Sequence, residues 1–403
     1  MHIVFVHQNF PAQFGHIGHF LAENHGFRCT FVSEKPPAKS GNIERIQYKV
    51  QGGATAQNHY CSRTFENATW HTHAVFEALK ARPNIKPDLI VGHSGFGSTL
   101  YLRELFDCPI INYFEYFYHT VGADMDFRPD FPTREIDKLR ARSRNAMLLL
   151  DLHNCDVGYS PTCWQKGRFP KLTHDKIRVI FDGIDTNIWK PQEELRKSPR
   201  KLGNLSIPEG TKIVTYATRG MESMRGFDIF MKMAKKLCDK RSDVVFIIAG
   251  QDRVCYGGDS RFTDGKSFKD WVTSQDTYDL SRFHFVGMLP PAGLSHLFSI
   301  TDLHIYLTVP FVLSWSLMNA LACGTTILAS KTAPVMEMIE DNKNGLLEDF
   351  FDVDGFVERA DQVLNDPQAY RHLGETGANM IRDQYSLDVC LPKMLELYQE
   401  VQT

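Results

Sequence analysis

Several features that define common protein classes are missing from this 403-residue chain. Its nine cysteines are odd in number and include no C-x-x-C pair, so we expect reduced thiols instead of a disulfide framework or a zinc knuckle. The net charge is only -3, which argues against a basic surface for nucleic acid. No Walker motif is present, and the glycines of 92–97 fit neither the dinucleotide-binding pattern nor the hydrolase elbow.

Long apolar segments are also scarce. The stretch 303–330 lacks Asp, Glu, Lys and Arg and is long enough to cross a bilayer, but Pro310, Gly324 and several hydroxyl side chains interrupt it. We interpret it as strands and a helix buried in an α/β layer. The first residues form an apolar run over 3–6 without the charged start of a signal peptide, so we expect a cytoplasmic protein.

One predicted helix, over 133–152, leaves two interpretations open. It carries five basic residues beside a run of apolar ones, and three carboxylates dilute its positive charge. An ordinary half-buried helix is the interpretation that we favour. The alternative is peripheral contact with the inner face of an anionic membrane.

Apolar runs alternate with helical stretches along the whole chain, which is typical of parallel sheets. Two series of such runs flank the polar segment 190–210, which has no apolar periodicity and suits a linker. We therefore predict an α/β protein of two Rossmann-like domains, 1–190 and 191–385, facing a central cleft. Ligands should lie at the carboxyl ends of the strands.

An anion-binding pattern follows the expected strand 213–216. Arg219 and Arg225 stand six residues apart, just before a helix that opens near Gly226. Guanidinium groups bind phosphate oxygens bidentately, and a helix N-terminus adds partial positive charge and amides. The spacing fits a phosphate site and, equally, two unconnected surface arginines. Farther on, Ser314 or Ser316 is expected to cap a short helix that ends at Gly324.

Taken in order, these segments resemble glycosyltransferase family 4. The opening 7–11 and the loop 311–317 resemble a bacterial subgroup associated with surface polysaccharides. The motifs that carry the resemblance are Arg219…Arg225-Gly226, Ala249-Gly250, Val286-Gly287, 320–324, Glu337 and 344–347. The resemblance implies the GT-B fold, with the last helix, 386–403, packed back on the first domain.

The resemblance also implies an activity. A retaining enzyme would transfer a hexosyl unit from a UDP- or GDP-sugar to a hydroxyl of a glycan, a lipid-linked acceptor or a small molecule. We expect no metal, no separate cofactor and no nucleic acid to take part. The nucleotide, the sugar, the acceptor and the oligomeric state are left open.

Residue by residue, the resemblance assigns a donor site. Arg219 and Arg225 would bind the diphosphate and serve catalysis, with Glu115 as a third catalytic residue where many members have histidine. The residues assigned to the nucleotide and the donor sugar are Gly250, Met288, Leu289, Val312, Leu313, Ser314 and Asn319. In the first domain, Asn9 and Phe10 begin a loop that would cover the phosphates.

Two departures from the family keep other functions open. The family's paired glutamates fall on Phe311 and Asn319, and a phenylalanine side chain cannot bond a sugar hydroxyl. A relative that binds nucleotide without transferring sugar is therefore a second hypothesis, and a nucleotide-sugar epimerase is a third. Glu115 itself suits either catalysis or a structural hydrogen bond.

Overall fold

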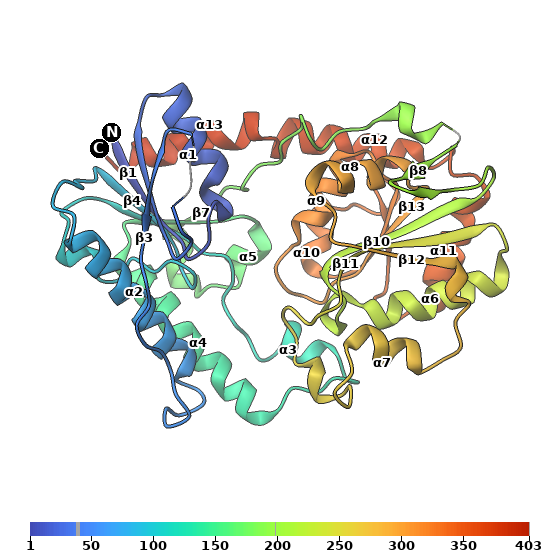
Figure 1. Ribbon diagram of the computed structural model, residues 1–403, viewed down its shortest axis with the longest axis horizontal. Helices are drawn as coiled ribbons and strands as arrows, with labels where there is room; N and C mark the ends of the chain where they lie inside the picture. The colour runs from blue at the N-terminus through green and yellow to red at the C-terminus, as the bar shows by residue number, and fades with distance from the viewer. Residues whose placement is uncertain (38–40, 198, 403) are drawn as a thin grey trace. The chain divides into compact units, whose positions relative to one another are not determined.

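The computed structural model describes residues 1–37, 41–197 and 199–402. The chain divides into two compact units. The N-terminal unit comprises Met1–Thr120, Arg134–Gly183 and Leu387–Thr403, and the C-terminal unit comprises Val121–Thr133 and Ile184–Ser386 (Figure 1). The main boundary therefore lies just before Ile184, ahead of the polar segment 190–210. Residues 198 and 403, which the predicted linker and last helix include, lie outside the described residues.

The N-terminal unit is built on a parallel sheet of seven strands in the order β3-β2-β1-β4-β5-β6-β7. The strands are β1 (His2–Val6), β2 (Arg28–Ser33), β3 (Ile43–Gln47), β4 (Leu89–His93), β5 (Ile110–Tyr113), β6 (Val157–Ser160) and β7 (Ile177–Val179). Every residue of β1 is buried, because helices cover both faces of the sheet. This order is the Rossmann order, which confirms the prediction for the first half.

Alternate residues of β1 face two different cores. Ile3 and Phe5 pack in a core with residues of α1 (Gly15–Asn24) and α13 (Leu387–Glu400), and the Phe5 and Tyr398 rings lie 6.4 Å apart. Val4 and Val6 pack in the core on the opposite face. The last helix thus contributes to the N-terminal unit. The remaining helices of this unit are α2 (Arg63–Lys80), α4 (Glu135–Asn154) and α5 (Cys163–Gly167).

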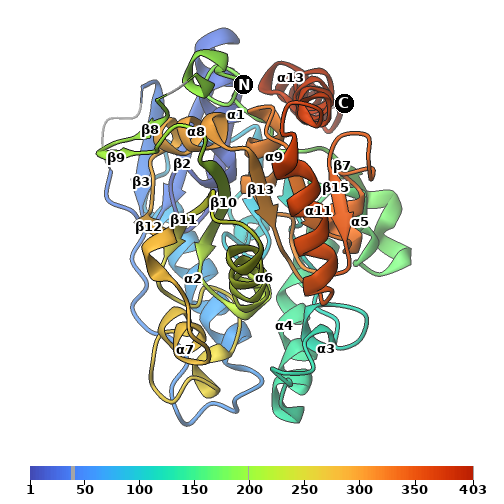
Figure 2. The same cartoon turned by 90° about the vertical axis from the view of Figure 1, so that its right-hand side faces the viewer.

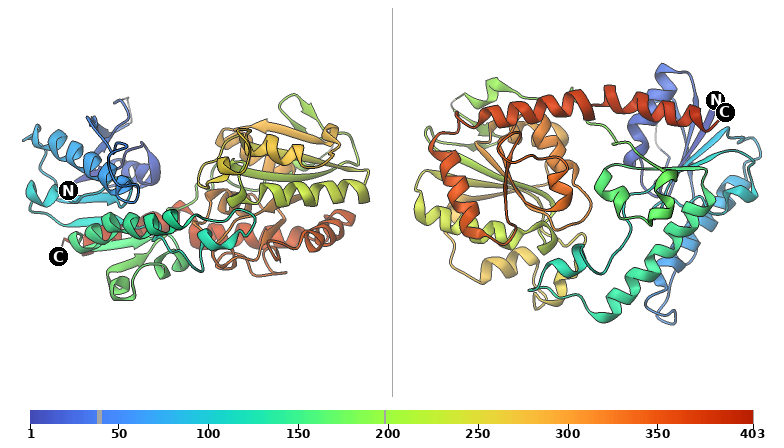
Figure 3. Two further views of the ribbon diagram at one scale, coloured as in Figure 1. Left: turned by 90° about the horizontal axis from the view of Figure 1, so that it is seen from below. Right: turned by 180° about the vertical axis from the view of Figure 1, so that it is seen from behind.

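The basic segment predicted over 133–152 forms α4, which lies beside α2 (Figure 3). Arg140 donates to the Thr64 and Tyr60 hydroxyls, and Arg144 donates to the Tyr118 hydroxyl. These two cations therefore belong to packing within the unit, as the half-buried interpretation expects. None of the helices within the described residues combines the length and the apolar character needed to cross a bilayer.

The C-terminal unit has a parallel sheet of six strands in the order β12-β11-β10-β13-β14-β15. The strands are β10 (Lys212–Gly220), β11 (Val244–Gln251), β12 (Phe283–Gly287), β13 (Leu303–Tyr306), β14 (Ile327–Ser330) and β15 (Leu346–Glu348), and β8 (Lys201–Leu202) and β9 (Leu205–Ser206) form a short hairpin. The helices are α3 (Asp124–Phe127), α6 (Phe227–Lys240), α7 (Phe268–Ser274), α8 (Pro291–Ile300), α9 (Trp315–Ala322), α10 (Ala333–Met336), α11 (Val353–Asn365) and α12 (Arg371–Met380).

Helices again pack on this second sheet. Helix α6 packs beside α11, and α8 packs on β10 and beside α9 (Figure 2). The charge-poor stretch 303–330 becomes β13, a loop, α9 and β14, which confirms its interpretation as part of a buried α/β layer. Both halves are therefore Rossmann-like, as predicted, and the carboxyl ends of β10, β11, β12 and β13 come together at one edge of the sheet.

Candidate functional site

The segment between β10 and α6 positions Arg225. A tight 3-10 turn covers Ser223–Arg225, and Gly226 follows with a φ of 63° as the N-cap of α6. A Cβ at Gly226 would lie 2.8 Å from the Cβ of Leu307, so both the backbone angle and the space require glycine. The amides of Arg225, Gly226 and Phe227 donate to Glu222 and Ser223 carbonyls within the turn. The donors that an anion would meet here are therefore guanidinium groups more than these amides.

Arg219 and Arg225 both contact one aromatic side chain, Tyr256. Arg225 is only 6% exposed, and its guanidinium carbon lies 5.4 Å from the centre of the Tyr256 ring. Arg219 is exposed, and its Nη1 donates to the Tyr256 hydroxyl at 3.4 Å. The structure thus brings the two predicted arginines to one side chain, Arg225 to its ring and Arg219 to its hydroxyl.

Tyr256 is a site residue that the sequence analysis missed. Its amide and that of Cys255 donate to the Glu222 carboxylate at 2.9 and 2.6 Å, which fixes the loop after β11 against the turn before α6. Burial raises the pKa of Glu222, although these two amides oppose that rise. The sequence next to Tyr256 contains Gly257-Gly258, which predicts a loop but does not indicate that Tyr256 contacts Arg219 or Arg225.

The loop after β13 completes the surroundings of Arg225. Nη1 of Arg225 donates to the Thr308 hydroxyl at 2.6 Å and to the Val312 carbonyl at 3.5 Å. Phe311 is buried with its ring centre 5.4 Å from that of Tyr256. The position that carries glutamate in the family is therefore filled by ring packing in this chain.

The remaining residues assigned to this loop lie on α9 and just before it. Val312 and Leu313 are buried, and Ser314 caps α9 by accepting from the Ser316 amide at 3.2 Å. Ser314 also donates its own amide to the Tyr306 hydroxyl. Asn319 is 9% exposed on α9.

A cavity of about 600 Å³ opens in the C-terminal unit at the carboxyl ends of β10, β11 and β12. Its lining residues are Met221, Gly250, Gln251, Asp252, Arg253, Lys269, Phe285, Gly287 and Met288. Two residues that the resemblance assigned to the nucleotide, Gly250 and Met288, therefore line it, whereas Leu289 is not among its lining residues. The size and the mixed lining suit a small-molecule ligand.

Gly250 is required by close backbone contact at this cavity. Its φ is 145°, and a Cβ there would lie 2.4 Å from the carbonyl oxygen of Thr218. Lys269 forms a 3.0 Å ion pair with Asp252 at the cavity wall. The cavity thus offers two cations, Arg253 and Lys269, one carboxylate and an apolar face from Phe285 and Met288.

In the N-terminal unit, Glu115 lies near a buried histidine. Its Oε2 is 3.9 Å from Nε2 of His93, and its backbone carbonyl accepts from Gln165. His93 is fully buried, and burial, together with the nearby His7, holds its pKa well below the usual value. His93 is therefore neutral, and its Nε2 has no hydrogen-bond partner within the described residues.

The first-domain loop keeps close to its own sheet. Asn9 is exposed, and its amide donates to Nδ1 of His7 at 2.9 Å. The ring of Phe10 lies 3.4 Å below the guanidinium of Arg45 and 4.8 Å from the centre of the Phe31 ring. Its side chain thus packs between Arg45 and Phe31.

The loop that follows β4 is held by a buried carboxylate. Ser94 and Ser98 donate their hydroxyls to the two oxygens of Asp151 at 2.8 Å each. Asp151 has no solvent exposure, and burial raises its pKa to about 6 against the opposing effect of the two hydroxyls. This carboxylate therefore fixes the loop that begins at His93.

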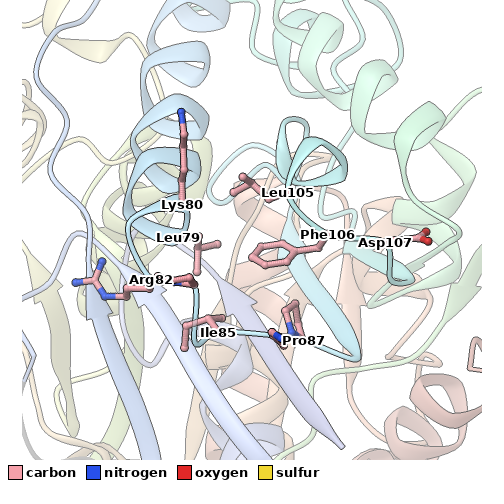
Figure 4. Close-up of a pocket in the computed structure, with 10 residues that line it drawn as sticks. Leu79, Lys80, Arg82, Ile85, Pro87, Leu105, Phe106 and Asp107 are labelled. Carbon is pink, nitrogen blue, oxygen red and sulfur yellow. The ribbon is translucent and has the colours of Figure 1, made fainter.

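A second cavity, of about 350 Å³, lies in the N-terminal unit between the end of α2 and the residues before β4 and β5. In Figure 4, Leu79, Ile85 and Phe106 converge, while Arg82 and Asp107 point away. It opens at the amino ends of the strands and presents no converging polar groups, so it is not the candidate active site. Within the described residues, no three His, Cys, Asp or Glu side chains are grouped to hold a metal ion.

Comparisons with known proteins agree with this architecture. The family pattern of the glycosyl transferase family 4 group matches residues 25–189, and that of glycosyl transferases group 1 matches residues 198–380. The chain is 23% identical over 239 residues to alpha-maltose-1-phosphate synthase of Mycolicibacterium smegmatis, which covers 58% of this chain and 59% of that protein. The chain thus matches about 59% of the length of that relative.

Solved structures match over nearly the whole chain. Sucrose-phosphate synthase from Thermosynechococcus elongatus has a TM-score of 0.73 at 18% identity, with 99% of this chain and 98% of that chain covered. HepE of Anabaena, solved in complex with UDP-glucose, has a TM-score of 0.68 at 14% identity, with 99% and 100% covered. At these identities the likeness establishes the fold.

The two family patterns together span most of the chain, and each falls mainly on one of the Rossmann-like halves described above. The chain therefore belongs to the glycosyltransferases of the family 4 type and has the GT-B fold.

Proposed function

We propose that this enzyme is a retaining, metal-independent transferase that moves a hexosyl unit from a UDP- or GDP-sugar to a hydroxyl of a glycan, a lipid-linked acceptor or a small molecule. The observation that carries the proposal is the buried Arg225 at the start of α6, with Arg219 on the same tyrosine. Two guanidinium groups, one at the end of β10 and one in the turn before α6, suit a diphosphate, since each can bond two phosphate oxygens.

The 600 Å³ cavity is the proposed nucleoside pocket. Phe285 and Met288 would face the base, and Gly250 would let the nucleotide approach the backbone. Val312 and Leu313 would offer their amides to the donor sugar, with Ser314 holding that loop, and Asn319 would bond the ribose. UDP is the first probe to use, because the structurally similar HepE was solved with UDP-glucose.

The proposed reaction needs no protein nucleophile. The acceptor hydroxyl attacks the anomeric carbon from the face that the diphosphate leaves, the bond from that carbon to the phosphate oxygen breaks, and the departing phosphate takes the acceptor proton. Arg225 and Arg219 stabilise the charge that develops on the leaving group. Glu115, beside the neutral His93, would bond the sugar or the acceptor hydroxyl.

Thermal shift with UDP, GDP and their hexose conjugates tests the donor site, because a ligand that binds only the native state raises the melting temperature. We expect one nucleotide series to stabilise the protein, and the product to keep the donor's anomeric configuration with activity unchanged in EDTA. No stabilisation by any of these ligands would contradict the proposal. Loss of activity in EDTA would contradict the proposal that the enzyme needs no metal.

A second candidate function is nucleotide binding without transfer. It is favoured by Phe311, whose ring packs on Tyr256 where a carboxylate is usual in the family. Binding by calorimetry with neither transfer nor donor hydrolysis would establish this function. Conversion of the donor to an epimer without acceptor would instead establish an epimerase.

The role of Tyr256 gives a first mutational prediction. Tyr256→Ala removes the ring that Arg219 and Arg225 share, and we expect the KM for the donor to rise about tenfold, as for loss of a cation–π contact to a buried guanidinium. Tyr256→Phe keeps the ring and loses one long hydrogen bond, so its KM should change by about twofold. Steady-state kinetics on both variants checks this, and equal effects would contradict it.

A further inference from the structure

A short segment that interrupts the N-terminal unit belongs to the C-terminal unit. Residues Val121–Thr133, here called the arm, group with the C-terminal unit, although the residues before and after them belong to the N-terminal one. The arm contains α3 and is anchored at two places by rings. Phe127 lies 5.2 Å from both Phe350 and Phe351, and Phe131 lies 5.4 to 5.9 Å from Phe262, Phe268 and Trp271.

Between these anchors, Arg128 is buried with only 5% exposure. Its Nη2 donates to Oδ2 of Asp228 at 2.6 Å, and its Nη1 reaches Oδ1 of Asp228 at 3.2 Å and the carbonyl of Ser223 at 2.5 Å. The rings of Phe131 and Phe350 lie 4.9 and 5.1 Å from its guanidinium carbon. Hydrogen bonds between charged groups are strong in such a dry setting.

The two partners of Arg128 lie on either side of Arg225. Ser223 opens the 3-10 turn that ends at Arg225, and Asp228 is in the first turn of α6. Ser223 is held a second time by Asp259, which accepts from its amide at 2.7 Å and from its hydroxyl at 2.6 Å. A single side chain from the arm therefore bridges both ends of the turn that presents Arg225.

We propose that Arg128 is a positioning residue for the diphosphate site. By bonding the Ser223 carbonyl and the Asp228 carboxylate together, it sets the distance between the turn and α6 and so the direction of the Arg225 guanidinium. This inference rests on the proposed function, in which Arg225 binds the donor diphosphate. The arm itself is already anchored by five aromatic contacts, so the ion pair is not needed to dock it.

The test uses a double variant that leaves no unpaired charge. Arg128→Met with Asp228→Leu replaces the buried ion pair by apolar side chains, an exchange that is often neutral for folding. The matched control is Arg200→Met with Asp302→Leu. Arg200 also binds a carboxylate, that of Asp302 at 2.7 Å, and a backbone carbonyl, that of Ile300. Both partners lie just before the amino end of β13, at the edge of the sheet away from the carboxyl ends of the strands. Arg128→Lys keeps the positive charge but loses the two parallel hydrogen bonds to the Asp228 carboxylate.

Calorimetry measures the affinity of each full-length variant for UDP and GDP and for the matching nucleosides, uridine and guanosine. We expect the Arg128/Asp228 variant to bind the diphosphate roughly 10- to 100-fold more weakly, as for a displaced catalytic group. Its nucleoside affinity should stay within about twofold, as should both affinities of the control. Arg128→Lys should fall between the wild type and the double variant.

Two results would overturn the inference. One is an Arg128/Asp228 variant that binds the diphosphate within twofold of the wild type. The other is an equal loss for nucleoside and diphosphate, which a general disturbance of the unit would produce. Arg225→Ala separates the two proposals. If it loses the diphosphate while the double variant keeps it, only the role of Arg128 falls. If Arg225→Ala binds the diphosphate normally, the proposed phosphate site falls, and the role of Arg128 with it.

Discussion

Replacing Arg225 by alanine is expected to lower kcat/KM for the nucleotide sugar roughly 100- to 1000-fold, the usual effect of removing one preorganised donor of charge stabilisation. Arg225 is 6% exposed and already oriented by Thr308, Val312 and Tyr256, so it needs little reorganisation when charge appears on the leaving diphosphate. A preoriented group in a dry site acts more strongly than a mobile one in water.

Arg219 and Arg282 provide the comparisons for this variant. Arg219 is exposed and makes a 3.4 Å hydrogen bond, so Arg219→Ala should cost only about tenfold, because solvent screens it. Arg282 donates to the carbonyls of Val244, Cys238 and Arg241 before the amino end of β12, and Arg282→Ala should lower stability without a specific loss of activity.

Steady-state kinetics and circular dichroism on the three variants check the ranking. Near-normal turnover by a folded Arg225→Ala protein, with a nucleotide sugar that the wild type uses, would show that the phosphate site is misassigned.

The elements of the C-terminal unit that carry Arg225 could be predicted because their signals are local. Strand β10 and helix α6 fall on an apolar run and a helical stretch, and the glycine between them is required by its own φ of 63°. The Rossmann-like class of both halves follows from the alternation of strands and helices along the chain. Residues that are close together in the sequence are therefore enough to predict these elements and the fold class.

The partners of Arg225 could not be predicted in the same way. Tyr256 lies 31 positions from it in the sequence, and it reaches Arg225 only because β11 pairs with β10. Arg128 is still farther, and its partner Asp228 is 100 positions away. Nothing in the residues around 121–133 predicts that this arm packs with the second half of the chain.

The N-terminal unit also contains a contact of this long-range kind, and it has a measurable pH dependence. Asp151, on α4, accepts hydrogen bonds from Ser94 and Ser98, 57 and 53 positions away. Burial raises its pKa to about 6 in the folded state, whereas an unfolded aspartate has a pKa of about 3.9. Because the folded pKa is the higher one, the contribution of Asp151 to stability is fully present below about pH 4 and is lost as the pH rises through 6.

The size of that loss follows from the two pKa values and is about 3 kcal/mol. Asp151→Asn cannot ionise, and a serine hydroxyl can turn to accept from its amide. We therefore expect the free energy of unfolding of the variant, measured relative to the wild type, to rise by about 2 kcal/mol between pH 4 and pH 7, with the rest of the change falling below pH 4. Urea-dependent hydrogen exchange at the amides of β4 and β5 measures it within the N-terminal unit.

Ser98→Ala provides the opposite test of the same carboxylate. The Ser98 hydroxyl lowers the pKa of Asp151 by bonding its ionised form, so removing that hydroxyl should raise the pKa further and deepen the loss of stability toward neutral pH. A difference between Asp151→Asn and the wild type that stays constant from pH 4 to pH 7 would show that Asp151 keeps an ordinary pKa. Because Ser94 and Ser98 belong to the loop that begins at His93, the expected result is that ionisation of one buried carboxylate loosens the backbone that places His93 beside Glu115.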